Sequence, residues 1–405
     1  MSYNVYLDCS EIRCKPSSVL TSKIYNYIIK NGHSIVNKIE NADYIILNAC
    51  GADEPRERDA INRISEYEGS KKDHTSILFL GCLPKINKDI LEYYKFRIEI
   101  IEHYDMLDEI FYSNIKFNDI EVGYIDKDIY TKLKIPYHNG AFGLFLKHAE
   151  RIFRKNIQKK RIEIEICQGC PFQCSYCAMN RSRGKTVVSR VPEDIITDIK
   201  TFIKKDIIIN LIADDCGSYG IDMNMDLCSL IYTIYEAFPD NYIDIYYLNP
   251  FWLSKFKNRY LELVGKTKIT SITIPVQSGS NKILSAMNRK YQIEEILNII
   301  EKLRIISPDI TIVTHLMVGF PGETIADFLK TLRIIKNFDI CNPLMYSDRP
   351  GTESTSMNNK IGSLRMFIRH KILLIACVIS FSAKGIKRFL KKLFVKVIAI
   401  NTPMQ

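Results

Sequence analysis

The chain has 405 residues, of which 46% are hydrophobic and 25% charged, with twelve cysteines and a formal net charge of +10. This composition excludes a disordered chain and allows two or three domains, each with its own core. The excess of Lys and Arg suits a polyanionic partner such as RNA, and it suits a general bias toward lysine equally well.

The first eight residues contain no basic segment followed by an apolar one, which predicts a cytoplasmic protein without a signal peptide. Thiols stay reduced in that compartment, so twelve cysteines indicate metal ligation or redox chemistry rather than a disulfide framework. The longest uninterrupted run of apolar or small residues, 372–383, is shorter than the ~18 residues needed to cross a bilayer. We therefore expect no transmembrane segment.

The amino-terminal part alternates between strand-like and helix-like segments. Apolar runs at residues 3–7, 44–47 and 77–80 predict strands, and residues 17–31 and 55–67 predict the helices between them. This alternation is typical of a parallel sheet with crossover helices. Residues 124–154 have weak periodicity and are expected to form a linker.

A longer alternation begins at Arg161. The predicted strands are residues 161–166, 207–213, 243–248, 269–276, 311–318 and a last one near 344–346, with helices such as 193–204 and 293–306 between them. Six strands with intervening helices predict a partial (β/α) barrel, whose site lies at the carboxyl ends of the strands. The regular alternation stops after Gly351.

A cysteine triplet follows the first strand of this barrel. Cys170, Cys174 and Cys177 have the spacing C-x3-C-x2-C. Three thiolates can bind three irons of a cubane cluster and leave the fourth iron open to another ligand. The alternative is a zinc site, which usually takes four ligands in paired sets; here only Cys167 lies nearby, and its role stays open.

A second triplet is spread over the amino-terminal part. Cys9, Cys50 and Cys82 each follow one of the three predicted strands. Loops at the carboxyl ends of neighbouring parallel strands converge, so these thiols are placed to share a second cluster. The alternative is that they are buried free cysteines acting as small apolar residues.

The segments around both triplets resemble the radical S-adenosylmethionine (SAM) methylthiotransferases. Residues 9–11, 47–52 and 80–83 are similar to the three cysteine motifs of the amino-terminal domain of that family. Later segments resemble it in the same order: residues 183–185, 189–193, 217–220, 275–280, 287–289, 318–324 and 346–352. The resemblance covers about residues 3–355, and the order of the segments is more specific than any one of them.

The resemblance implies an α/β fold in four parts. These are an amino-terminal parallel-sheet domain over residues 1–125, a linker over 126–158, a partial (β/α)6 radical SAM barrel over 159–355 and a short helical, basic and amphipathic tail over 356–405. It further implies two [4Fe–4S] clusters, one on Cys170, Cys174 and Cys177 that binds SAM, and one on Cys9, Cys50 and Cys82 that delivers sulfur.

Seven further residues are expected to bind SAM. Tyr176 occupies the position where the family places an aromatic residue against the adenine. The backbone at Gly319 and Gly322 allows close approach of a cofactor, and Arg289 can bind a carboxylate. The remaining expected contacts are Asp214, Gln277 and Ser278.

The resemblance implies a transferase that inserts a methylthio group at an unactivated C–H bond. The segments at 215–220 and 277–280 look most like members that act on C2 of a threonylcarbamoyl-adenosine at position 37 of tRNA. A peptide or protein side chain is the alternative substrate, and a non-catalytic Fe–S electron carrier or sensor is the alternative of another class. An electron donor such as flavodoxin or ferredoxin is expected.

The carboxyl-terminal segment departs from the family. Members usually end in a small β-barrel, the TRAM domain, and residues 356–405 do not predict one. Basic residues instead recur on one face of a predicted helix, at Lys384, Lys387, Arg388, Lys391 and Lys392. Such a helix binds nucleic acid, a membrane surface or a partner protein, or simply packs on the barrel with its lysines in water.

Overall fold

The computed structural model describes residues 2–11, 14–94, 98–125, 160–203 and 206–400, together with Ile129 and Leu133. The side chains of Ile90 and of residues 385–400 are not part of that description. Apart from Ile129 and Leu133, the expected linker at 126–158 lies outside the described residues.

The amino-terminal part is a parallel sheet with the strand order β2-β1-β3-β4-β5. The predicted strands and helices are found as β1 (Asn4–Cys9), α1 (Lys15–Lys30), β3 (Tyr44–Ala49), α2 (Glu54–Ser70) and β4 (Ser76–Gly81). The edge strands β2 (Ser34–Ile35) and β5 (Glu99–Ile100) have two residues each, which is too short for a periodic signal. Short helices α3 (Leu83–Ile86), α4 (Lys88–Glu92) and α5 (Met106–Ile110) complete this part.

Helices cover both faces of this sheet. Ile24, Tyr27 and Ile28 of α1 pack with α5 and the following turn on one face. Ile64 and Tyr67 of α2 pack on the other face. Because both faces are buried, the central strands are almost continuously apolar, which is why the short runs in the sequence identify them.

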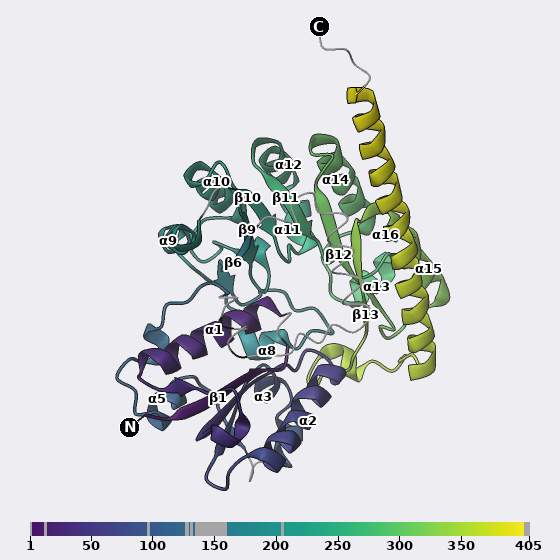
Figure 1. The fold of residues 1–405 in the computed structure, drawn as a ribbon. Coiled ribbons are helices and arrows are strands. Elements are labelled where there is room, and N and C mark those ends of the chain that lie inside the picture. The colour runs from purple at the N-terminus through teal and green to yellow at the C-terminus, as the bar shows by residue number, and fades with distance from the viewer. Residues whose placement is uncertain are drawn as a thin grey trace.

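The second part is a parallel sheet of six strands in the order β13-β12-β11-β10-β9-β6 (Figure 1). The strands are β6 (Arg161–Glu165), β9 (Ile208–Ile212), β10 (Tyr242–Ile245), β11 (Ile269–Thr273), β12 (Thr311–Val318) and β13 (Ile340–Met345). The helices are α8 (Met179–Arg183), α9 (Pro192–Phe202), α10 (Leu227–Ala237), α11 (Pro250–Lys255), α12 (Lys257–Lys266), α13 (Asn281–Ala286), α14 (Ile293–Ile306) and α15 (Ile325–Ile334). A small antiparallel pair, β7 (Cys167–Gln168) with β8 (Val188–Ser189), flanks the cysteine loop. The fold is therefore the expected partial (β/α) barrel.

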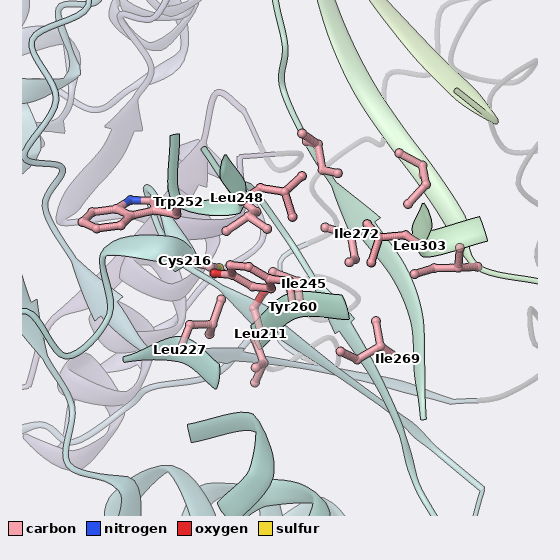
Figure 2. Close-up of a cluster of buried hydrophobic side chains, with 14 of the residues drawn as sticks. Leu211, Cys216, Leu227, Ile245, Leu248, Trp252, Tyr260, Ile269, Ile272 and Leu303 are labelled. Carbon is pink, nitrogen blue, oxygen red and sulfur yellow. The ribbon is translucent and has the colours of Figure 1, made fainter. Parts of the chain in front are cut away.

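The core of the barrel lies between its strands and its outer helices. Figure 2 shows Leu211, Ile245 and Ile272 from successive strands against Tyr260 of α12 and Trp252 of α11. Burying a large apolar side chain of this kind contributes about 1.5–3 kcal/mol. Cys167 is also fully buried in this core, with its thiol 3.8 Å from the carbonyl oxygen of Asp215, so it packs as a small apolar residue.

The carboxyl-terminal segment is one continuous helix, α16 (Ser363–Ile400), at the outer edge of the barrel beside β13 (Figure 1). The apolar run and the basic segment of the sequence thus belong to a single element. Its part Ser363–Lys384 has a mean hydropathy of 1.7 and is long and apolar enough, by length and composition, to cross a membrane. The expectation of no such segment rested on the uninterrupted run alone, and the helix begins nine residues before that run.

The two sheets are joined by polar contacts at both edges of the barrel. Lys15 of α1 binds Glu163 of β6 at 2.8 Å. Beyond β13, Arg349 binds Glu57 of α2 at 2.7 Å and donates to the carbonyl oxygen of Gly51 at 3.3 Å. Both partners of the Arg349–Glu57 pair are less than one-tenth exposed.

We expect Glu57→Ala to lower the free energy of unfolding by about 3–5 kcal/mol, because Arg349 would be left as a buried charge without its partner. Urea unfolding of the full chain measures this loss. The matched control is Glu54→Gln on the same helix, which breaks an exposed pair with Arg58 and is expected to cost at most about 1 kcal/mol. Equal losses in the two variants would contradict the prediction.

Candidate functional site

The cysteines of the amino-terminal triplet lie at the carboxyl ends of parallel strands. Cys9 ends β1, Cys50 directly follows β3 and Cys82 directly follows β4. The barrel triplet of Cys170, Cys174 and Cys177 lies in the loop between β7, a strand of the antiparallel pair, and α8. Helix α3, which follows Cys82, packs on α8, which follows Cys177, and Cys82 itself contacts Ala178. The structure thus brings the loops of the two triplets together.

The loop that carries Cys170, Cys174 and Cys177 is held by backbone contacts. Gly169 has a φ of +85°, a conformation that favours glycine, and its N–H donates to Asp214 at 3.1 Å. The N–H of Cys170 donates to the carbonyl oxygen of Gly184 at 3.3 Å. On the other side, Ser175 donates through its backbone to Met287 and through its hydroxyl to Ala286. These bonds fix the loop on the barrel independently of any ligand.

Burial acts strongly on these thiols. It raises the pKa of Cys177 to about 12 and also raises the pKa of Cys170. Without a bound metal, Cys170 and Cys177 therefore hold their protons at neutral pH. A bound cation would have to stabilise the thiolates, which is the normal coupling between metal binding and thiol ionisation.

Within the described residues, no group of three or more His, Cys, Asp or Glu side chains has the spacing of a single-ion site. This geometry does not supply the tetrahedral zinc site that the sequence left as an alternative. A cubane cluster holds its thiolates farther apart than one ion does, so the finding bears on the zinc alternative only.

Beside the loop lie buried polar atoms that have no partner within the protein. Gln277 has a φ of +71°, is buried, and its Oε1 atom is unpaired. Arg289 is half-buried, its Nε atom is buried and unpaired, and its charge opposes the effect of burial on the pKa of Cys177. An unsatisfied buried polar group costs about 1–3 kcal/mol. Together with the strained backbone, these atoms fit a polar ligand that would complete them.

Tyr176 lies in the same region. Its ring meets that of Phe320 edge-on, with the ring centroids 6.5 Å apart, and it packs against a cluster that includes Met287 and Met317. The aromatic residue of the triplet loop is thus placed on the Val318–Phe320 end of β12.

Three further predicted SAM contacts are Ser278, Gly319 and Gly322. The fully buried Ser278 hydroxyl lies 3.2 Å from that of Thr331 and accepts from the N–H of Ser280. Gly319 has a φ of +86°, and a Cβ there would lie 2.5 Å from the sulfur of Met366 in α16. Gly322 has a φ of +80° and no atom within 4 Å of an added Cβ. Ser278 and Gly319 thus have packing roles, whereas Gly322 is open.

The amino-terminal thiols include one that the sequence analysis missed. Cys14 is the N-cap of α1, and together with Cys82 it raises the pKa of Cys50 beyond the effect of burial. Burial raises the pKa of Cys14, whereas Arg183 of the barrel lowers it and Asp214 of the barrel raises it. The thiol of Cys9 instead faces α1, 3.7 Å from the hydroxyl of Ser17. The available signal was a fourth cysteine at the predicted start of a helix, five residues after Cys9.

A group of three barrel residues lies toward the amino-terminal thiols: Tyr246, Tyr247 and His315. The hydroxyls of Tyr246 and Tyr247 are 3.1 Å apart, and the ring of Tyr247 meets His315 at 5.2 Å. Burial, followed by the charge of Arg289, lowers the pKa of His315 to about 4, so this histidine is neutral at pH 7. Burial raises the pKa of Tyr247 to about 12, and among nearby groups Cys14 raises it and Arg56 lowers it. Tyr247 therefore lies next to the amino-terminal domain.

Glu165 is a second residue that the sequence analysis missed. It ends β6, is buried, and accepts from Gln168 at 2.9 Å. Burial raises its pKa to about 7, while Arg183 lowers it and Asp214 raises it. A buried carboxyl with a raised pKa close to the barrel triplet loop is suited to proton transfer. The available signal was a glutamate at the carboxyl end of a strand in which charged residues alternate with isoleucines.

Family models match both parts of the chain. The Radical SAM superfamily matches residues 164–335, and the family described as uncharacterized protein family UPF0004 matches residues 9–101. The first match contains Cys170, Cys174 and Cys177, and the second contains Cys9, Cys14, Cys50 and Cys82.

Three curated relatives align over most of the chain. A probable threonylcarbamoyladenosine tRNA methylthiotransferase of Pyrococcus horikoshii is 31% identical over 330 residues, 80% of this chain and 72% of the relative. A tRNA-2-methylthio-N(6)-dimethylallyladenosine synthase of a Thermoanaerobacter species is 29% identical, covering 88% of this chain and 74% of the relative. A ribosomal protein uS12 methylthiotransferase of Alkaliphilus oremlandii is also 29% identical, with 86% and 76% covered.

Solved structures agree on the fold. The radical SAM methyltransferase TsrM of Kitasatospora setae, with tryptophan and a SAM analogue bound, superposes with a TM-score of 0.57 at 13% identity. The match covers 87% of this chain and 75% of that chain. At this identity the likeness concerns the arrangement of the elements alone.

We expect Glu165→Gln to remove a pH-dependent part of the stability. The folded protein keeps the Glu165 proton up to about pH 7, whereas the unfolded chain releases it near 4.5, the ordinary pKa of a glutamate. The contribution of Glu165 is thus complete below pH 4.5 and is lost as the pH rises to 7. Relative to the wild type, the free energy of unfolding of Glu165→Gln should rise over this range, by up to about 3 kcal/mol. Urea unfolding at pH 5 and pH 7.5 measures the difference, and the same difference at both values would contradict the assignment.

Proposed function

The chain belongs to the radical SAM methylthiotransferase family, and from this premise we propose that it methylthiolates C2 of a modified adenosine at position 37 of tRNA. The family consists of transferases that act on tRNA or on a ribosomal protein and use two [4Fe–4S] clusters and SAM. The finer assignment, to a threonylcarbamoyl-adenosine, is part of the proposal.

In this proposal, Cys170, Cys174 and Cys177 hold the cluster that binds SAM, and Cys9, Cys50 and Cys82 hold the second cluster. The observation that carries it is the packing of α3 on α8, which brings the two triplet loops together. When bound, the clusters and SAM supply the radical chemistry and the methylthio group, and the protein positions them.

The residues beside the barrel triplet have distinct proposed roles. Arg289 binds the carboxylate of SAM through its unpaired Nε. Gln277 meets a polar group of the cofactor through its unpaired Oε1, and Tyr176 lies against the adenine. Asp214 and Gly319 hold the loops at this end of the barrel, and Gly322 leaves room for a close backbone approach.

Cys14 gives the amino-terminal site a fourth thiol. The Cys9 thiol bonds toward Ser17 in this structure, and cluster binding would require it to turn toward Cys50 and Cys82. Cys14 already lies near those two residues. Cys9 stays in the proposed ligand set because β1 delivers it to the same sheet edge as Cys50 and Cys82.

The substrate is proposed from the relatives. Two of the three named above act on tRNA by their names, and the third acts on ribosomal protein uS12. A protein or peptide side chain is therefore the second candidate. Flavodoxin or ferredoxin is the proposed electron donor, and the proposed location of the enzyme is the cytoplasm.

We expect expression of the gene in a host that lacks adenosine methylthiolation to produce a new methylthio-adenosine derivative in bulk tRNA. Nucleoside mass spectrometry detects and identifies it, and Cys170→Ala is expected to abolish it. A protein that forms 5′-deoxyadenosine from SAM without any new nucleoside would move the assignment to the protein or peptide substrate. A reconstituted protein that forms no 5′-deoxyadenosine would favour the electron carrier or sensor.

We expect Cys50→Ala and Cys82→Ala each to reduce the iron of the anaerobically reconstituted chain from about eight to about four atoms, the loss of one cubane. Iron and sulfide analysis, with Mössbauer spectroscopy, measures the loss. The matched control is Cys228→Ala, a buried cysteine of α10 in the barrel core, which should keep the full content. The same iron analysis of Cys9→Ala and Cys14→Ala identifies the third ligand, because only the variant that lacks this ligand should lose about four iron atoms.

A further inference from the structure

Helix α16 has two apolar faces, and only one of them is covered. Leu373, Cys377 and Phe381 are buried, and the helix lies along β13. Arg369 binds Glu323 at 2.6 Å, and Lys384 donates to the carbonyl oxygen of Phe338. This covered face attaches the helix firmly to the barrel.

The opposite face carries large apolar side chains that are exposed. They recur at helical spacing and lie on one side of the helix, and their exposed fractions range from 44% to 71%: Leu364, Phe367, Ile368, Ile372, Ile375 and Ile379. We call these six residues the apolar stripe. In the most apolar window of Ser363–Lys384, only 17% of the residues are buried. Burial in the protein core therefore does not explain the apolar composition of this helix.

Helix α16 also carries almost all of the excess positive charge. Residues 363–400 contain nine Lys or Arg and no Asp or Glu, while the formal net charge of the whole chain is +10. Arg365 and Lys371 are exposed next to the apolar stripe, and the ammonium group of Lys371 lies 5.0 Å from the ring centroid of Phe367. Within helix α16, the exposed apolar side chains are thus accompanied by cations and by no acidic residue.

We propose that the apolar stripe of α16 binds the surface of an anionic phospholipid bilayer. The helix lies in the plane of the interface, with the stripe among the acyl chains and Arg365 and Lys371 at the phosphates. This combination of an apolar face and basic residues is that of an interfacial helix. Spanning the bilayer is not proposed, because it would require Leu373, Cys377 and Phe381 to leave the barrel.

The same observations disfavour the other occupants. RNA would use the cations, but a stripe of six aliphatic and aromatic side chains offers nothing to phosphates. A second copy of this chain would cover the stripe, but it would also bring two acid-free basic helices together, which costs free energy. The bilayer alone satisfies both the apolar and the charged part of the surface.

The test is flotation of the reconstituted full chain with vesicles of mixed phosphatidylcholine and phosphatidylglycerol, and with phosphatidylcholine alone. We expect binding to the anionic vesicles, reduced by salt. Ile375→Ser with Ile379→Ser, which leaves the charge unchanged, should weaken it about tenfold or more. Arg365→Gln with Lys371→Gln should weaken it about fivefold or more on anionic vesicles.

The matched control is Ile29→Ser with Ile305→Ser, two exposed isoleucines on α1 and α14, helices that do not pack closely on α16. This pair should bind as the wild type does. Leu364→Ser with Phe367→Ser is a second stripe variant for the case in which the first does not fold, and thermal unfolding identifies that case.

Absence of wild-type flotation, or equal loss in the stripe and control variants, would overturn the proposal. So would a wild-type dimer that dissociates in Ile375→Ser with Ile379→Ser, because the occupant would then be a second copy. Loss of tRNA binding in the stripe variants, without vesicle binding by the wild type, would assign the surface to RNA. None of these outcomes depends on methylthiotransfer, so they leave the proposed function untouched.

Discussion

The contact between the amino-terminal domain and both edges of the barrel is the constraint on which the rest of the structure depends. A six-stranded partial barrel has two free edges, here β6 and β13. Lys15 binds beside the first, and Glu57 binds Arg349 just beyond the second. Because the Arg349–Glu57 pair is buried, its desolvation is costly, and it is favourable only when both partners are in place. The two cysteine loops meet because the domain is held at both edges.

Some residues with a strained backbone or an unsatisfied polar atom lie where the barrel meets the amino-terminal domain. Gln277 and Tyr247 are non-glycine residues with positive φ, and Gln277 and Arg289 each keep an unpaired buried polar atom. Such groups lower the stability of the isolated protein and persist because the surrounding strands fix them. Gln277 and Arg289 lie beside the cysteine loop at the carboxyl ends of the barrel strands, which makes them candidates for ligand binding.

The sequence could predict what is local. A cysteine after an apolar run is the end of a buried strand, so the two triplets and most strands followed from position alone. Cys14 and Glu165 could not be found in this way, because their surroundings come from elements distant in the chain. The buried pair of Arg349 with Glu57 likewise joins residues that are far apart in the chain. Gly319, which was predicted to contact the cofactor, also leaves room for Met366 of α16, a helix whose place on the barrel the sequence did not reveal.

The location of the charge changes what it means for function. Nearly all of the net charge resides on α16, so the remainder of the chain is close to neutral, and net charge by itself is no argument for RNA binding by the catalytic domains. The same helix reaches the cofactor end of the barrel through Glu323. This carboxylate accepts from Arg369 of α16 and from the N–H of Gly319 at 3.0 Å. The covered face of α16 therefore supports the loop after β12, while the exposed face is free for another partner, so substitutions on the two faces separate a structural role from a binding role.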